Sequence, residues 1–314
     1  MKKGLVISGG GSKGAWAGGV IDYLVSEKQY DWNVVFGTST GGLLAPLASL
    51  GETKRLKDAY TNVNDTDIFS IRPFNSIGKI RVLNAIWRIL NNKISLGDAG
   101  KLEQLIKKFF TEEDYHKTLD RNKTVCCVVT NFTSGDTEYK YQNKIDYDNF
   151  CDWMKATSAV PIVFDPYINV LNNLYLDGGV TIHVPIQEAI HNQCDEIDII
   201  ILRPEKHNSD YWTGHNMWDV LQRTLDLMLE SISIHDVIVG QLEGELDNIK
   251  LNFYYTPYNL TDNSAVFNKE QMIKWWNEGY EFAKDNTPKT LLLAKKETIF
   301  SAKTNTHVNK YQII

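Results

Sequence analysis

Residues 4–27, GLVISGGGSKGAWAGGVIDYLVSE, contain a short apolar run, a glycine-rich loop and an amphipathic segment in immediate succession. The run Gly4 to Ser8 is typical of a buried strand, because it is short, apolar and bounded by glycine. From Ala15 to Glu27, apolar residues recur at helical spacing. The order strand, loop, helix predicts that the chain opens an α/β fold.

The rest of the chain continues this alternation. Further strands are expected at residues 34–36, 124–130, 174–176, 197–202 and 251–255, and helices at 43–50, 98–110, 147–157, 186–191, 217–242 and 269–284. Residues 137–141 are expected to return beside 124–130 as a hairpin. Because no repeat or linker interrupts the chain, we expect one α/β domain over residues 1–300, with a mostly parallel central sheet flanked by helices. Residues 301–314 are expected to form a polar tail.

Composition excludes several classes of protein. Lys plus Arg total 33 against 39 Asp plus Glu, a formal charge of -6, which disfavours nucleic acid as a partner. The four cysteines form no C-x-x-C pair, and two of them are neighbours in an apolar run, so they are expected to be buried and reduced. No signal peptide and no 18-residue apolar run is present, which predicts a cytoplasmic protein without a transmembrane segment.

The glycine loop has four interpretations. Gly9, Gly11 and Gly14 fit the dinucleotide-binding pattern G-x-G-x-x-G, but the second strand ends at Gly37 and not at the acidic residue that would hold a ribose. A Walker A loop fails because Lys13 is followed by glycine. What remains is the loop Gly9, Gly10, Gly11, Ser12, Lys13 and Gly14 as a cradle for an anion near a helix N-terminus, or a simple tight turn.

A second glycine-marked site follows the next strand. Gly37, Thr38, Ser39, Thr40 and Gly41 form G-x-S-x-G between an apolar strand and a helix. This is the setting of a nucleophile elbow, in which a strained turn exposes the serine hydroxyl. A third site, Asp177-Gly178-Gly179, places an aspartate at the end of a short strand, where a turn without function is the alternative.

These motifs, in this order, resemble the patatin-like phospholipases. The family pattern combines a G-G-G-x-[RK]-G oxyanion loop, a G-x-S-x-G elbow and a D-G-[GA] aspartate, and residues 156–161, ATSAVP, look like its A-x-S-A-x-P stretch. Two residues depart from the usual pattern, since Ser8 stands where the plant enzymes have aspartate and Lys13 where arginine is usual. Ile182-His183-Val184-Pro185 matches the usual N-x-P only loosely, because His183 replaces the asparagine.

The resemblance implies a three-layer α/β/α fold and a lipid acyl hydrolase of phospholipase A type. Ser39 would be the nucleophile and Asp177 its base, the backbone N–H groups around Gly10 and Gly11 would hold the oxyanion, and Lys13 would position the loop. The substrate would be a phospholipid or another acyl lipid, and no cofactor would be required. A soluble carboxylesterase or thioesterase on the same dyad, and a non-catalytic lipid-binding module, remain alternatives.

A catalytic triad is the competing mechanism, and it requires a histidine after the aspartate. Among the seven histidines, His183 is the one that follows Asp177 closely. No H-E-x-x-H or other paired metal spacing appears, so metal-independent chemistry is favoured and no metal is predicted.

One further stretch stands out in this acidic chain. Between Phe69 and Gly97 there is no Asp or Glu, yet five cations occur, and apolar residues that include Trp87 recur at helical spacing. Such a segment is typical of a lid or of a helix at a membrane surface, although a solvated basic helix is the alternative. The sequence therefore predicts a peripheral membrane contact or lid at these residues: Lys79, Arg81, Trp87, Arg88 and Lys93.

Overall fold

A mixed nine-stranded sheet organises the computed structural model, which describes residues 1–75, 78–168, 171–205, 214 and 217–291. The strand order is β5-β6-β3-β2-β1-β7-β8-β9, and β4 pairs with β3 off this path. The five central strands β3, β2, β1, β7 and β8 are parallel, and the outer pairings are antiparallel. The strands are β1 Lys3–Ile7, β2 Val34–Thr38, β3 Thr124–Asn131, β4 Asp136–Tyr141, β5 Tyr167–Ile168, β6 Leu174–Asp177, β7 Glu196–Ile201, β8 Lys250–Tyr255 and β9 Lys289–Leu291.

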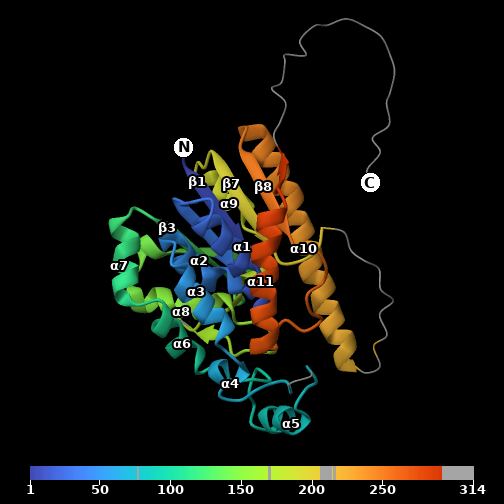
Figure 1. Cartoon of the computed structure of the whole chain (residues 1–314). Coiled ribbons are helices and arrows are strands. Elements are labelled where there is room, and N and C mark those ends of the chain that lie inside the picture. The colour runs from blue at the N-terminus through green and yellow to red at the C-terminus, as the bar shows by residue number, and fades with distance from the viewer. Residues whose placement is uncertain (76–77, 169–170, 206–213, 215–216, 292–314) are drawn as a thin grey trace, which may run out of the picture.

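Helices cover both faces of the sheet, as a parallel sheet requires (Figure 1). The α-helices are α1 Gly14–Ser26, α2 Thr40–Leu50, α3 Thr53–Thr61, α4 Asp65–Ile68, α5 Val82–Leu90, α6 Leu102–Phe109, α7 Glu112–Asp120, α8 Tyr147–Thr157, α9 Ile186–His191, α10 Met217–Asp247 and α11 Lys269–Asp285. Three short 3-10 helices, η1 Gly11–Lys13, η2 Gln142–Lys144 and η3 Gly178–Val180, complete the described elements. The prediction of a three-layer α/β/α fold with a mostly parallel central sheet is confirmed.

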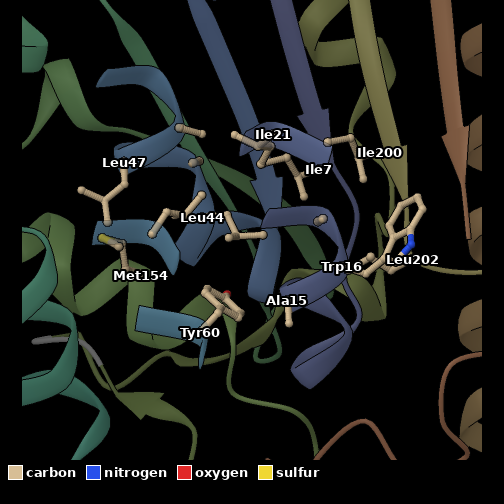
Figure 2. Close-up of a cluster of buried hydrophobic side chains, with 14 of the residues drawn as sticks. Ile7, Ala15, Trp16, Ile21, Leu44, Leu47, Tyr60, Met154, Ile200 and Leu202 are labelled. Atoms are coloured by element: carbon tan, nitrogen blue, oxygen red, sulfur yellow. The ribbon is translucent and has the colours of Figure 1, made fainter. Parts of the chain in front are cut away.

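Alternation along the strands divides the interior into two cores. Leu5 and Ile7 of β1 face a large cluster built from α1, α2, α8 and α11, whereas Val6 faces a smaller cluster with α9 and α10. Figure 2 shows Ile7 and Ile200 from neighbouring strands beside Ile21 and Leu44 in the larger cluster. Cys126 and Cys127 divide between the two cores in the same way, and all four cysteines are free and buried, as predicted.

Two strands meet end to end along β3. β4 pairs with residues 126–131 along one edge of β3. β2 pairs with residues 124–128 and β6 with residues 129–131, so both of these strands lie along the other edge of β3. β2 ends with Thr38 opposite Val128, and β6, running the other way, ends with Asp177 opposite Val129. The residues that follow β2 and end β6 are therefore brought together by the register of a third strand.

None of the described helices combines the length and apolar character that crossing a bilayer requires. The predicted tail, residues 301–314, lies outside the described residues.

Candidate active site

Ser39 occupies a strained turn between β2 and α2. Its φ of 56° and ψ of -126° place a non-glycine residue in a sparsely populated region of conformational space. The turn is tight because a Cβ on Gly41 would lie 2.2 Å from the Ile7 carbonyl oxygen, and one on Gly37 would lie 2.2 Å from the backbone of Gly41. Close backbone packing, of Gly41 against β1 and of Gly37 against Gly41, therefore requires glycine at both positions, as the elbow interpretation expects.

The glycine loop lies beside Ser39 at the end of β1. The N–H of Ser12 donates to the Ser264 carbonyl at 2.8 Å, that of Lys13 to Gly10 at 3.1 Å, and that of Gly9 to His183 at 3.3 Å. The N–H groups of Gly10 and Gly11 donate to no other described residue, and both glycines line the same cavity as Ser39. Backbone N–H groups that line a cavity with a serine are available to an anion bound there.

Asp177 lies within hydrogen-bond reach of the Ser39 side chain. Its carboxylate also accepts the Gly179 N–H at 2.8 Å, and the residue is 5% exposed. Burial raises the pKa of Asp177 to about 7, and the hydrogen bonds from Ser39 and Gly179 oppose that rise. A carboxylate without a cationic partner among the described residues, bonded to a serine hydroxyl, can accept the proton of that hydroxyl.

The A-x-S-A-x-P stretch holds both members of this pair. Thr157 Oγ1 accepts the Ser39 N–H at 3.0 Å and donates to the Val128 carbonyl, and the Ala159 carbonyl accepts the Asp177 N–H at 2.9 Å. Thr157 was not among the predicted site residues, although the motif that contains it was visible in the sequence. Thr40 was predicted as part of the elbow, and its hydroxyl is hydrogen-bonded to Tyr60 Oη at 2.5 Å.

The histidines separate into two groups. His183 lines the cavity with Ser39 and Asp177, whereas His116, His191 and His235 are exposed. His207, His215 and His307 lie outside the described residues. In the described part of the chain, no group of three His, Cys, Asp or Glu side chains is arranged to hold a metal ion.

Ser39 and Asp177 line a cavity of about 800 Å³. Side chains of α2, α3, α6 and α8 give it apolar walls, formed by Leu43, Leu47, Leu56, Leu102, Leu105, Ile106, Phe109 and Met154. Charged and polar side chains also line it, and these include Lys13, Arg203, Gln222, Arg223, Asp226, Glu230 and Asp262. Burial lowers the pKa of the Lys13 ammonium, and Asp226 opposes this shift.

The segment predicted to meet a membrane differs from the expectation at Arg88. In α5, Leu83, Trp87 and Leu90 are 83%, 52% and 77% exposed, but Arg88 is only 3% exposed. Arg88 donates to Asp165 at 2.8 Å and to the carbonyl and hydroxyl oxygens of Ser95, which makes it an internal anchor and not a surface cation. The sequence pattern missed this because Asp165 is distant along the chain.

The residues predicted to form a lid lie away from the cavity lining. Lys79, Arg81, Trp87 and Lys93 are exposed, and none of them lines the active-site cavity; within the described part of residues 72–93 only Phe74 does. In Figure 1, α5 lies at the lower end of the molecule with α4, apart from the sheet.

The fold and this site define a class of α/β/α proteins with an elbow serine, a glycine loop and a buried aspartate. The model of one family, described as patatin-like phospholipase, matches residues 5–190, and the chain belongs to that family. It is 27% identical over 201 residues to "Probable lipid hydrolase 463L" of Invertebrate iridescent virus 6, a match over 61% of this chain and 65% of the viral protein. The match thus covers less than two thirds of the length of that relative. The crystal structure of VipD from Legionella pneumophila is similar over 92% of this chain and 68% of that chain, with 16% identity and a TM-score of 0.49.

Proposed function

We propose that this protein is a lipid acyl hydrolase of phospholipase A type, in which Ser39 attacks a fatty acyl ester and Asp177 serves as its base. The Ser39 hydroxyl gives its proton to Asp177, its oxygen bonds to the ester carbonyl carbon, and the alcohol leaves with that proton. Water then hydrolyses the acyl-enzyme. The Gly10 and Gly11 N–H groups hold the oxyanion in both steps.

The observation that carries this proposal is the state of Asp177. A buried carboxylate bonded to a serine hydroxyl, with no cation paired to it among the described residues, lowers the stability of the folded protein. Such a cost is typical of functional sites. The strained φ of Ser39 at the same point is a second cost of this kind.

The cavity favours a lipid substrate. Its apolar walls suit a fatty acyl chain, and its charged lining residues, which include Lys13 and Arg203, suit a polar head group. A soluble carboxylesterase or thioesterase would use the same dyad and would prefer short acyl groups. A non-catalytic lipid-binding module would leave Ser39 unreactive.

We further propose that α5 contacts the lipid surface. Its apolar side chains are exposed, and Arg72, Arg81 and Lys101 line a depression beside Trp87. Apolar side chains with neighbouring cations favour binding to a membrane that contains anionic lipids. If α5 binds the membrane surface, it does not cover the cavity, because no residue of α5 lines it.

The described sheet supports the expectation of one domain over residues 1–300. It takes β1 from residues 3–7 and β9 from residues 289–291, so both ends of the described chain join one sheet.

The test is labelling and hydrolysis by the same protein samples. The wild type should react with a fluorophosphonate at one site and release fatty acid from phosphatidylcholine or phosphatidylglycerol vesicles. Ser39→Ala should lose the adduct and at least roughly 10³-fold of the hydrolysis rate, while Ser49→Ala, a buried serine elsewhere on α2, should keep both. An adduct on the Ser39→Ala protein would refute the assignment of the nucleophile. Faster cleavage of short water-soluble esters than of vesicles at all concentrations would favour the esterase.

A further inference from the structure

His183 lies between the two loops that form the reactive site. Its carbonyl accepts the Gly9 N–H at 3.3 Å, which ties it to the glycine loop. Its own N–H and that of Val184 donate to Asp236 of α10 at 2.7 and 2.9 Å. The backbone of this residue is therefore fixed from two sides.

The imidazole ring occupies space that two glycines leave open. A Cβ on Gly9 would lie 2.7 Å from its Cε1 atom, and a Cβ on Gly179 would lie 3.0 Å from its Nδ1 atom. That same point beside Gly179 is 3.1 Å from Asp177 Oδ1. Nδ1 and the aspartate oxygen therefore both lie beside Gly179, on the side where a side chain would project.

The Nδ1 atom is buried and has no hydrogen-bond partner among the described residues. Leaving a buried polar atom unpaired costs about 1–3 kcal/mol, so a water molecule that enters the cavity and bonds to Nδ1 would remove this cost. His183 and Asp177 line the same cavity as Ser39, so a water molecule in that cavity can reach both side chains.

The charge state of the ring suits this partner. Burial lowers the pKa of His183 to about 3, and the positive charges of Lys13 and Arg203 lower it further, whereas a hydrogen bond between the ring and the Gly9 backbone opposes the shift. The ring is therefore neutral at neutral pH, with one nitrogen free to accept a hydrogen bond. A charged imidazolium would pair with Asp177 and weaken it as a base, and the neutral ring avoids this.

We propose that His183 positions the water molecule that hydrolyses the acyl-enzyme on Ser39. It is a positioning residue and not the base of a triad. The water oxygen bonds to the acyl carbonyl carbon while one water proton moves to the Asp177 carboxylate. The bond from that carbon to Ser39 Oγ then breaks, and the proton passes to Oγ, which gives the free fatty acid and the regenerated enzyme. The inference rests on the proposed function of Ser39 and Asp177.

The experiment separates acylation from deacylation with p-nitrophenyl butyrate in a stopped-flow instrument. His183→Leu keeps the side-chain volume but removes the polar nitrogen. We expect its first equivalent of p-nitrophenol to appear at the wild-type rate and its steady-state rate to fall at least roughly tenfold. Intact mass should show a butyryl group accumulating on the variant, and hydroxylamine, a stronger nucleophile than water, should restore turnover.

Two further variants make the result specific. His183→Asn restores the amide found in the usual N-x-P motif and should stay within about threefold of the wild-type steady-state rate, because asparagine places a polar atom near the Nδ1 position. His116→Leu changes an exposed histidine of α7 and should change nothing. Circular dichroism and the melting temperature confirm that each variant is folded.

Failure of His183→Leu to accumulate acyl-enzyme would overturn the inference, as would an equal slowing of the first equivalent and of steady-state turnover. An inactive His183→Asn protein would do the same, because a polar atom alone would then not suffice. Absence of a fluorophosphonate adduct on wild-type Ser39 would instead refute the proposed function, so the two failures are distinguishable.

Discussion

Asp177 and Arg88 are both ionisable and almost completely buried, but they differ in whether an opposite charge lies beside them. Arg88, 3% exposed, donates to Asp165 and twice to Ser95, so its charge is balanced and several of its donors are used. Asp177, 5% exposed, receives hydrogen bonds from Ser39 and Gly179 but has no cation paired to it among the described residues. Burial alone therefore does not separate a structural charge from one proposed to react.

The two regions differ in what the charge does for its surroundings. Arg88 connects α5, whose other side chains are largely exposed, to the loop that carries Asp165. The hydrogen bonds that Asp177 accepts could also be accepted by the amide oxygen of a neutral asparagine. Removing Arg88 should therefore cost structure, and neutralising Asp177 should cost activity.

The largest expected effect follows from neutralising the reactive charge. Asp177→Asn should lower hydrolysis of a soluble ester by roughly 10³-fold or more, since the serine loses its base. The folded protein should be no less stable at pH 8, because asparagine still accepts the Gly179 N–H and is not penalised by burial of a charge. Initial rates and urea unfolding measure the two quantities. A marked loss of stability in Asp177→Asn would contradict the contrast between the two regions.

Removing the structural charge should have the next largest effect. Arg88→Met should open α5 about 30-fold more often, which corresponds to about 2 kcal/mol for a broken and partly exposed ion pair with its hydrogen bonds. Hydrogen exchange of the peptide that covers residues 82–90 measures this opening. Arg81→Met, a change at an exposed cation next to the same helix, is the matched control and should leave exchange unchanged. If both variants behave alike, the buried bonds of Arg88 do not anchor the segment.

The pH dependence of activity sharpens the comparison further. Because Asp177 must be ionised to act as a base and burial raises its pKa to about 7, kcat/KM should fall roughly tenfold per pH unit below that value.

The stability of the folded protein should change with pH in the opposite direction to the activity. The raised pKa favours the folded protein at low pH, and this contribution is lost as the pH rises from about 4 through about 7. Asp177→Asn should lack that loss, so its stability relative to the wild type should increase with pH. A flat rate profile between pH 5 and pH 8 would exclude Asp177 as the base.

The smallest expected effect concerns the exposed cations near α5. Lys79→Gln should weaken binding to vesicles that contain phosphatidylglycerol about fivefold, or about 1 kcal/mol, and salt should remove most of the difference. Cosedimentation at low and high salt measures binding, and hydrolysis of a soluble ester should not change. Lys117→Gln, a change at an exposed lysine of α7, is the control. Equal weakening by both variants would mean that the whole acidic protein, and not this segment, determines binding.

Much of the reactive region was predictable because its signals are local. The turn at Ser39 and the loop from Gly9 to Gly14 are specified by glycines within a few residues, and the alternation of strands and helices predicted where they lie in the fold. The aspartate was predictable only through the order of several motifs, since Asp-Gly by itself is a common turn. Asp236, which holds the backbone of His183, gave no signal, because an acidic residue on an amphipathic helix is ordinary.

The α5 region shows the limit of the same reasoning. Helical spacing predicted a helix and the exposed apolar side chains were expected, but the pattern treated all cations alike. Whether a cation such as Arg88 points outward depends on a partner that the tertiary fold brings to it. Here that partner is Asp165, in a loop whose Val163 carbonyl also accepts the Gly97 N–H at 3.0 Å.

The end-to-end arrangement of β2 and β6 along β3 has a consequence for how such a site changes over evolution. Thr38 and Asp177 pair with the consecutive residues Val128 and Val129, so the separation of the two reacting groups is counted in residues of one strand. Each residue of a strand advances the chain by about 3.3 Å, and a shift by one also turns every side chain to the other face. The distance between Ser39 and Asp177 can therefore change only by a shift of one residue in strand register, and such a shift would separate the two side chains. Gradual variation among relatives is left to the helices that line the cavity, where side chains can be exchanged one at a time while the chemistry at the strand ends stays fixed.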